Sequence, residues 1–115
     1  MFLTLVRFYP RPDRQDAVRR FLAGILGPTR VQPGCLGCTL ATESDPDALL
    51  YMEIWESEAD LLKRLRSDGY ARVLATMELS TTKPEVCIYE VISHRGLEWI
   101  ENLRMANHEE GGAGQ

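Results

Sequence analysis

The sequence predicts an α+β domain of the ferredoxin-like class, with a βαββαβ order, a four-stranded antiparallel sheet and helices on one face. Two observations predict this class. Four short stretches rich in β-branched and aromatic residues are bounded by turn residues, as strands are. Stretches with apolar residues at helical spacing follow the first and the third of them. The expected strand order across the sheet is 4-1-3-2.

The first strand and the first helix are each bounded by local stop signals. The strand is expected at residues 2–9, and Pro10 and Pro12 end it. A helix then opens near Asp13, and Gly27-Pro28 is expected to stop it. The apolar stripe of this helix consists of Val18, Phe21, Leu22, Ile25 and Leu26.

The second and third strands are expected to form a hairpin. They are placed at residues 35–42 and 48–56, and the turn-rich segment 43–47 joins them. Ser57 is a good N-cap for the helix that follows, and Asp60 stands three residues later, close to a capping box. The apolar period therefore changes from that of a strand to that of a helix at Ser57.

A second cap at Ser67 is expected to break the second helix before its apolar stripe resumes. The fourth strand, expected at residues 85–92, completes a single domain at residues 1–94. Residues 95–115 are expected to be an extension, with a helix at 96–106 and then a polar, Gly-rich, disordered tail. One face of the extension helix is apolar and consists of Trp99, Ile100 and Leu103.

The composition argues against several classes of function. The chain has 115 residues, 44% hydrophobic and 26% charged, which is typical of one globular domain. Its net charge of -4 argues against a nucleic-acid or anionic-membrane partner, because both require a basic surface. The apolar runs are far shorter than the roughly 18 residues of a membrane span, and the start lacks a signal-peptide pattern. Three cysteines without disulfide spacing indicate a cytoplasmic location.

The cysteines and histidines do not form a metal or redox pattern. Cys35 and Cys38 spell C-x-x-C, but in an extended strand they are expected to point to opposite faces. His94 and His108 lie in a loop and in the tail, without metal-ligand spacing to the cysteines. The sequence also lacks a Gly-rich phosphate loop and a nucleophile elbow. No metal site is therefore expected.

Both faces of the predicted sheet are apolar, which predicts a homodimer. Two helices cover only one face, so a like sheet from a second copy is the simplest cover for the other. In the third strand, alternate residues form an aliphatic set, expected to face the helices, and a second set that contains Glu53. A buried carboxylate needs a partner. Arg7 on the first strand is the leading candidate on this chain, and an arginine of the second copy is the alternative. The aliphatic set is Leu50, Met52 and Ile54, and the other is Leu49, Tyr51, Glu53 and Trp55.

Three short motifs, in this order and spacing, carry a family resemblance. Pro33-Gly34-Cys35 forms the turn into the second strand, Tyr51-Met52-Glu53-Ile54-Trp55 lies in the third, and Ser67-Asp68-Gly69-Tyr70 lies on the second helix. With these motifs, residues 2–92 resemble the antibiotic biosynthesis monooxygenase (ABM) domain of the dimeric α/β-barrel group. The resemblance implies a homodimer whose two sheets close a barrel, with a substrate cavity between sheet and helices in each subunit. It also implies oxygenation of polycyclic or quinol-type aromatics by O2 without flavin, haem or metal.

The candidate site residues combine this resemblance with the predicted elements. Such chemistry needs aromatic walls, a base or acceptor, and a cation near the developing oxyanion. The candidates for catalysis are Arg7, Glu53 and Arg64, and the candidates for substrate binding are Tyr51, Trp55 and Tyr70.

Each candidate also has a purely structural interpretation. Glu53 is compatible with an ion pair at the dimer interface, and Trp55 and Tyr70 are compatible with core aromatics. For Arg64, in the run Lys63-Arg64-Leu65-Arg66, a solvated helix residue is the favoured interpretation.

The sequence departs from the family pattern at one position of the second helix. Many members carry a histidine there, where this chain has Arg64, and arginine stabilises an anion but is no general base. Haem-degrading relatives need a histidine ligand, and residues 57–80 contain none. Two alternatives therefore stay open beside a monooxygenase: a dimeric small-molecule binding or stress-related module without turnover, and an isomerase on the same scaffold.

Overall fold

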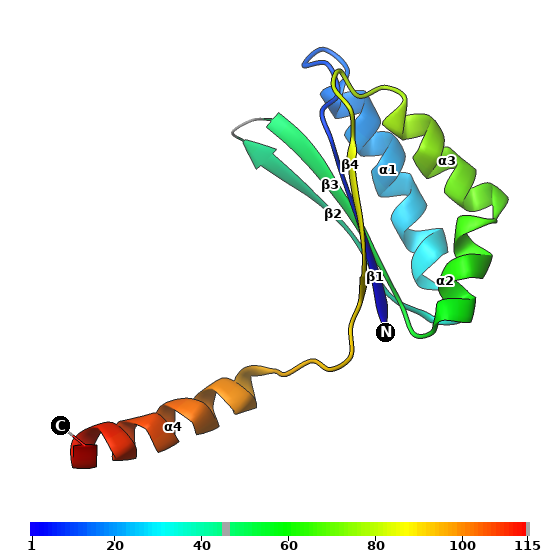
Figure 1. The fold of residues 1–115 in the computed structure, drawn as a ribbon. Coiled ribbons are helices and arrows are strands. Elements are labelled where there is room, and N and C mark those ends of the chain that lie inside the picture. Colours follow the sequence, from blue (N-terminus) through cyan, green and yellow to red (C-terminus); the bar gives the residue numbers. More distant parts are fainter. Residues whose placement is uncertain (45–46, 115) are drawn as a thin grey trace.

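The computed structural model describes the backbone of residues 1–44 and 47–114, and side-chain surroundings up to residue 106. The predicted βαββαβ order is confirmed, with the second helix in two parts and a helix added at the C-terminus (Figure 1). The elements are β1 (Phe2–Phe8), α1 (Gln15–Arg30), β2 (Cys35–Ser44), β3 (Asp47–Trp55), α2 (Glu58–Leu65), α3 (Asp68–Met77), β4 (Glu85–Glu90) and α4 (Leu97–Gly114).

The four strands form one antiparallel sheet in the order β2-β3-β1-β4, which is the predicted order read from the other edge. The register places Glu53 of β3 between Thr4 of β1 and Cys38 of β2. Helices α1, α2 and α3 lie on one side of the sheet, and the other side carries no helix of the main body (Figure 1). Residues on the helix side of β1 and β3 therefore form the core of the domain.

The prediction of which set in β3 faces the helices is wrong. The set with Tyr51, Glu53 and Trp55 is at most 1% exposed and packs under the helices, whereas Met52 and Ile54 remain partly exposed on the outer face. Alternation separates the two sets but does not say which is inside. The inner set can be buried because its polar side chains form hydrogen bonds with one another: Tyr51 and Trp55 both donate to Glu53.

Helix α1 does not stop at Gly27-Pro28, as the sequence predicts, but continues to Arg30. Proline removes one backbone donor and usually breaks a helix. Here tertiary contacts hold the last turn, because Thr29 is buried and Arg30 donates through Nε to the carbonyl of Cys38 at 2.9 Å. The extra turn brings the Thr29 hydroxyl to the interior of the domain.

The break between α2 and α3 occurs where the sequence predicts it. Ser57 caps α2 by accepting from the N–H of Asp60, and Ser67 caps α3 by accepting from the N–H of Tyr70, both at 3.2 Å. The Ser67 hydroxyl also donates to the carbonyl of Arg64 at 2.6 Å. The break therefore places Arg64 in the last turn of one helix close to Tyr70 in the first turn of the next.

A β-bulge changes the direction of the cysteines in β2. The register shifts between Cys35 and Gly37, so that Cys35 pairs with Trp55 and Cys38 with Glu53. Both cysteines therefore lie on the helix side, and the expectation that they point to opposite faces is wrong. Leu36 is the residue turned outward, with 55% of its surface exposed.

Helix α4 stands away from the main body (Figure 1). The radius of gyration is 18.4 Å, compared with about 13 Å for a compact domain of this length. The sequence predicts a disordered tail at residues 107–115. The side chains of these residues, and the backbone of residue 115, lie outside the described part of the structure. The exposed apolar residues of α4 are Leu97, Trp99, Ile100, Leu103 and Met105.

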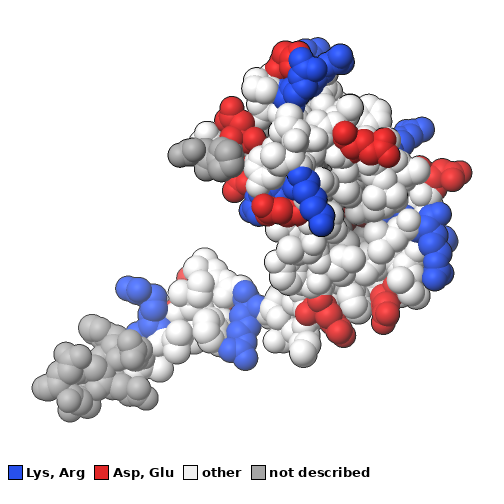
Figure 2. Space-filling view, turned by 45° about the horizontal axis from the view of Figure 1, so that its top comes forward, with Lys and Arg blue, Asp and Glu red and all other residues white. Residues whose placement is uncertain are grey.

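No helix in the described part of the chain is long and apolar enough to cross a membrane. On the face shown in Figure 2, positive and negative side chains are interspersed.

Candidate functional site

A buried carboxylate lies at the centre of the helix side of the sheet. Glu53 has no exposed surface. One of its oxygens accepts from the Tyr51 hydroxyl at 2.5 Å, and the other accepts from the indole Nε1 of Trp55 at 2.9 Å. Arg64 donates to the same carboxylate through Nε, at 3.2 Å to each oxygen, and through Nη2 at 3.0 Å. The carboxylate is therefore paired and hydrogen-bonded on both oxygens.

Arg64 is the cation of this cluster, and the interpretation of Arg64 as a solvated residue is wrong. It is only 2% exposed, because the last turn of α2 directs it toward the sheet. Its Nη2 also donates to the Thr29 hydroxyl of α1 at 3.0 Å, and its guanidinium lies 5.7 Å from the centre of the Tyr70 ring. One side chain thus joins α1, α2, α3 and β3.

The electrostatics of the cluster keep its phenols protonated. Burial raises the pKa of Tyr51, and its hydrogen bonds with Cys38 and Glu53 raise it further. Burial and the charge of Glu53 raise the pKa of Tyr70 to about 12, against the opposing effect of Arg64. Burial alone would lower the pKa of Arg64, but hydrogen bonds and charge from Glu53 outweigh it, so this pKa is raised. The guanidinium stays charged and both phenols stay neutral at physiological pH.

Arg7, the predicted partner of Glu53, lies on the opposite face of the sheet. The register pairs it with Leu50, one of the outward residues. Its Nε donates to Glu43 at 2.7 Å and its Nη1 to Glu85 at 2.8 Å, and these bonds raise the pKa of Arg7. Of the six predicted site residues, the structure brings five together, Tyr51, Glu53, Trp55, Arg64 and Tyr70, and leaves Arg7 apart from them.

Three members of the cluster were missed in the sequence. Thr29 lies beyond the expected end of the first helix, so the helical pattern does not place it in the core. Cys38 donates from its thiol to the Tyr51 hydroxyl at 3.3 Å, and burial raises the pKa of that thiol. Thr4 is 1% exposed, and its hydroxyl is the only buried side-chain polar atom without a hydrogen-bond partner among the described residues. A threonine between apolar residues on the inner face of β1 was the signal for it.

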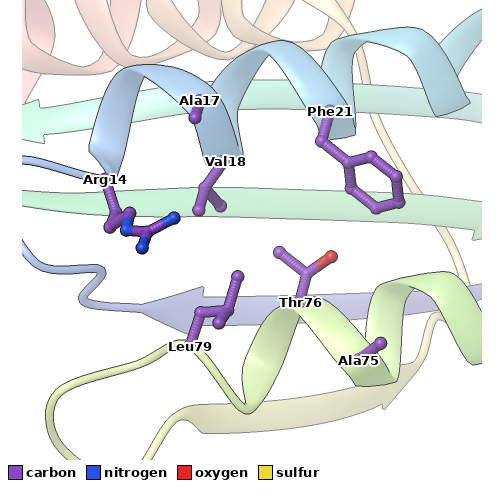
Figure 3. A pocket seen from close by; sticks show the side chains of 7 residues that line it. All are labelled: Arg14, Ala17, Val18, Phe21, Ala75, Thr76 and Leu79. Atoms are coloured by element: carbon purple, nitrogen blue, oxygen red, sulfur yellow. The ribbon is translucent and has the colours of Figure 1, made fainter.

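An apolar cleft opens between α1 and α3, and no pattern in the sequence predicts it. Its volume is about 290 Å³. Figure 3 shows Val18 and Phe21 of α1 on one side of this space, and Thr76 of α3 with Leu79 of the segment that follows α3 on the other. Val18 belongs to the same packed core as Tyr51 and Tyr70. The cleft is lined by Arg14, Ala17, Val18, Phe21, Ala75, Thr76 and Leu79.

The arrangement limits the chemistry that the cluster can perform. Because Glu53 accepts hydrogen bonds on both oxygens, it is not a free general base in this arrangement. What the cluster supplies is an ion pair fixed in place, with the guanidinium of Arg64 beside aromatic surfaces, in an interior where electrostatic interactions are strong. Among the described residues, no group of three or more His, Cys, Asp or Glu side chains is placed to hold a metal ion.

The ion pair generates a first prediction. Arg64→Met leaves Glu53 buried without its cationic partner and should lower the free energy of unfolding by about 3–5 kcal/mol. Glu53→Gln together with Arg64→Met should cost less than the two single changes added, with a coupling of about 1–3 kcal/mol. Urea denaturation of the four proteins measures this, with Arg66→Met, at the exposed C-cap residue of the same helix, as the control. Additive losses would contradict the pairing.

The hydroxyl of Thr4 generates a second prediction. Thr4→Val removes a buried polar atom without a partner and should raise the free energy of unfolding by about 1 kcal/mol. The matched change Thr29→Val removes a hydroxyl that is hydrogen-bonded to Arg64 and to the carbonyl of Ile25, and should lower it by about 1–3 kcal/mol. Both are measured by chemical denaturation. A loss of stability in Thr4→Val would mean that a bound water satisfies Thr4.

Comparison with known proteins agrees with this fold. Residues 1–76 match the family described as antibiotic biosynthesis monooxygenase. "Putative monooxygenase Rv0793" of Mycobacterium tuberculosis is 31% identical over 80 residues, which span 70% of this chain and 79% of that protein.

Two solved structures show the likeness in three dimensions. The structure of Rv0793 superposes with a TM-score of 0.73 at 27% identity, covering 83% of this chain and 98% of Rv0793. A protein from Deinococcus radiodurans, described as "a putative antibiotic biosynthesis monooxygenase", has the same fold, with a TM-score of 0.73 at 21% identity over 84% of this chain and 98% of its own. The chain therefore belongs to the antibiotic biosynthesis monooxygenase family.

Proposed function

We propose that this protein is a cofactor-independent monooxygenase that oxidises a small aromatic or quinol-type molecule with O2. The observation that carries the proposal is the buried pair of Glu53 and Arg64, surrounded by Tyr51, Trp55 and Tyr70, in a chain of this family. A buried ion pair contributes little net stability compared with apolar residues of similar volume. Its place beside three aromatic side chains fits a role in binding and charge stabilisation.

The reaction fits such an interior without a resident cofactor. An anthrone or hydroquinone that has lost a proton is electron-rich enough to reduce O2 itself. In the oxidation of an anthrone to an anthraquinone, one oxygen atom of O2 enters the new carbonyl, and the other leaves as water with the two methylene hydrogens. The protein has to bind the ring, favour its anion and exclude bulk water.

In this proposal the residues of the cluster have separate roles. Arg64 supplies the positive charge that favours the substrate anion, and Glu53 is a positioning residue that fixes the guanidinium. Trp55, Tyr51 and Tyr70 form the aromatic surroundings. The cleft between α1 and α3 is the candidate entrance. Val18 lines it and belongs to the same packed core as Tyr51 and Tyr70, so Val18 has to move for a substrate to reach Arg64.

A homodimer is part of the proposal. The outer face of the sheet has no helix over it, and Leu50, Met52 and Ile54 are partly exposed there. A second copy is the simplest cover for such a face. A cytoplasmic location also belongs to the proposal and is supported by the three free cysteines of the described chain.

The outer face generates a third prediction. The wild-type protein should sediment as a dimer at micromolar concentration, and Met52→Glu should sediment as a folded monomer, because it places a charge at the interface. Leu74→Glu is the matched control, since Leu74 is exposed on the helix side, and should remain dimeric. A wild-type monomer would refute the dimer.

Binding without turnover is the second candidate function. Two observations favour it. Glu53 accepts hydrogen bonds from three side chains, and Arg64 stands where many members of the family carry a histidine. A binding module would hold the aromatic in the same surroundings but would consume no O2. An isomerase on the same scaffold has no comparable observation in its favour.

An oxygen-electrode assay separates these functions and supplies the fourth prediction. The wild-type protein should consume O2 with an anthrone or a naphthohydroquinone above the uncatalysed rate, and EDTA should not change it. The double change Glu53→Gln/Arg64→Met, in which no unpaired charge remains, should lower kcat/KM at least tenfold. Arg66→Met should stay within twofold.

The opposite results are equally clear. Binding of the aromatic without O2 uptake would favour the binding module. Uptake abolished by EDTA would contradict the absence of a metal cofactor. Full activity in the double variant would remove the ion pair from the mechanism.

A further inference from the structure

The cleft between α1 and α3 has the size and lining of a site for a flat aromatic molecule. Its volume of about 290 Å³ is at the small end of ligand sites, which range from roughly 300 to 1,000 Å³, so it suits one or two fused rings. Phe21 is 49% exposed and Leu79 54% exposed. Figure 3 shows both projecting toward the space between the helices. These side chains offer the apolar walls that such a ring needs.

One arginine at this cleft is without a partner. Among the described residues, the side chain of Arg14 makes no hydrogen bond or ion pair. Its neighbours in sequence do, because Arg11 pairs with Asp13 at 2.9 Å, and Arg19 and Arg20 share Asp16. Figure 3 shows the guanidinium of Arg14 turned over the cleft beside Val18. The charge of Arg14 is therefore available to a ligand in the cleft.

A second hollow adjoins the cleft at Arg14. This second hollow has a volume of about 370 Å³ and shares Arg14 and Leu79 with the cleft. Glu78 also lines it. Because Arg11 is neutralised by Asp13, Arg14 is the cation of this lining that has no ion pair among the described residues. The remaining lining residues are Arg11, Ser80 and Thr81. A ligand with rings in the cleft would place a polar group in this hollow.

We propose that the cleft binds a flat aromatic molecule carrying one carboxylate, with Arg14 as the residue that recognises the carboxylate. The guanidinium matches a carboxylate with two parallel donors, and the apolar walls hold the ring. This inference rests on the proposed function where it names the substrate class, an aromatic acid. The binding site itself depends only on the cleft and its charge, and it is tested without turnover.

The experiment compares two ligands with the same rings and different charge. The probes are 2-naphthoate and its neutral counterpart 2-naphthylmethanol, and isothermal titration calorimetry at pH 7 and low salt measures their dissociation constants. The wild-type protein should bind the naphthoate about fivefold more tightly, and added salt should reduce this preference. Arg14→Gln should remove the preference and leave the affinity for 2-naphthylmethanol within twofold.

Two further variants locate the site. Arg20→Gln changes an exposed arginine of the same helix that pairs with Asp16 and does not line the cleft, and should keep the preference. Ala75→Trp places a large ring in the cleft from the exposed side of α3, and should abolish binding of both probes.

Several results would overturn the proposal. Equal affinity for the two probes would mean that the cleft does not recognise the carboxylate. A preference that survives Arg14→Gln, or binding that survives Ala75→Trp, would place the ligand elsewhere. If naphthoate binds as expected while no O2 is consumed in the oxygen-electrode assay, the site stands and the monooxygenase activity fails. If O2 is consumed but neither probe binds, the monooxygenase activity stands and the proposed site fails.

Discussion

The structure depends on one interaction, the buried ion pair between Glu53 on the central sheet and Arg64 on the second helix. Removing two charges from water costs several kcal/mol, and the protein offsets this cost with hydrogen bonds on every side of the carboxylate. Those bonds fix the elements that supply them. Three features of the fold contact this pair: the inner orientation of β3, the extra turn of α1 at Thr29, and the break before α3.

The fold could be predicted from the sequence because its signals are local. Each of these signals depends on a few neighbouring residues: the apolar period, the caps at Ser57 and Ser67, and the order of the strands. The errors arise where distant contacts decide. Pro28 stays inside a helix because Thr29 and Arg30 are held by other elements, and Cys35 turns inward because a bulge adds one residue to β2.

The candidate site was predicted in part, for the same reason. Tyr51, Glu53 and Trp55 alternate on one strand, so the sequence places them together, but alternation is symmetric and cannot say which side the helices cover. Arg64 was misjudged because its neighbours are charged, although the 3.6-residue period turns it toward the sheet. The cleft with Arg14 lies between two helices that are far apart in sequence, so no local sequence pattern predicts it.

Helix α4 follows the sheet but stands clear of it, and most of its described side chains are exposed. An isolated helix of this length is only marginally stable in water, while the sheet and its three helices share one core. In a single chain the two parts therefore melt independently, the helix first and without cooperativity. Signals from the core and from α4 should therefore follow different thermal unfolding curves.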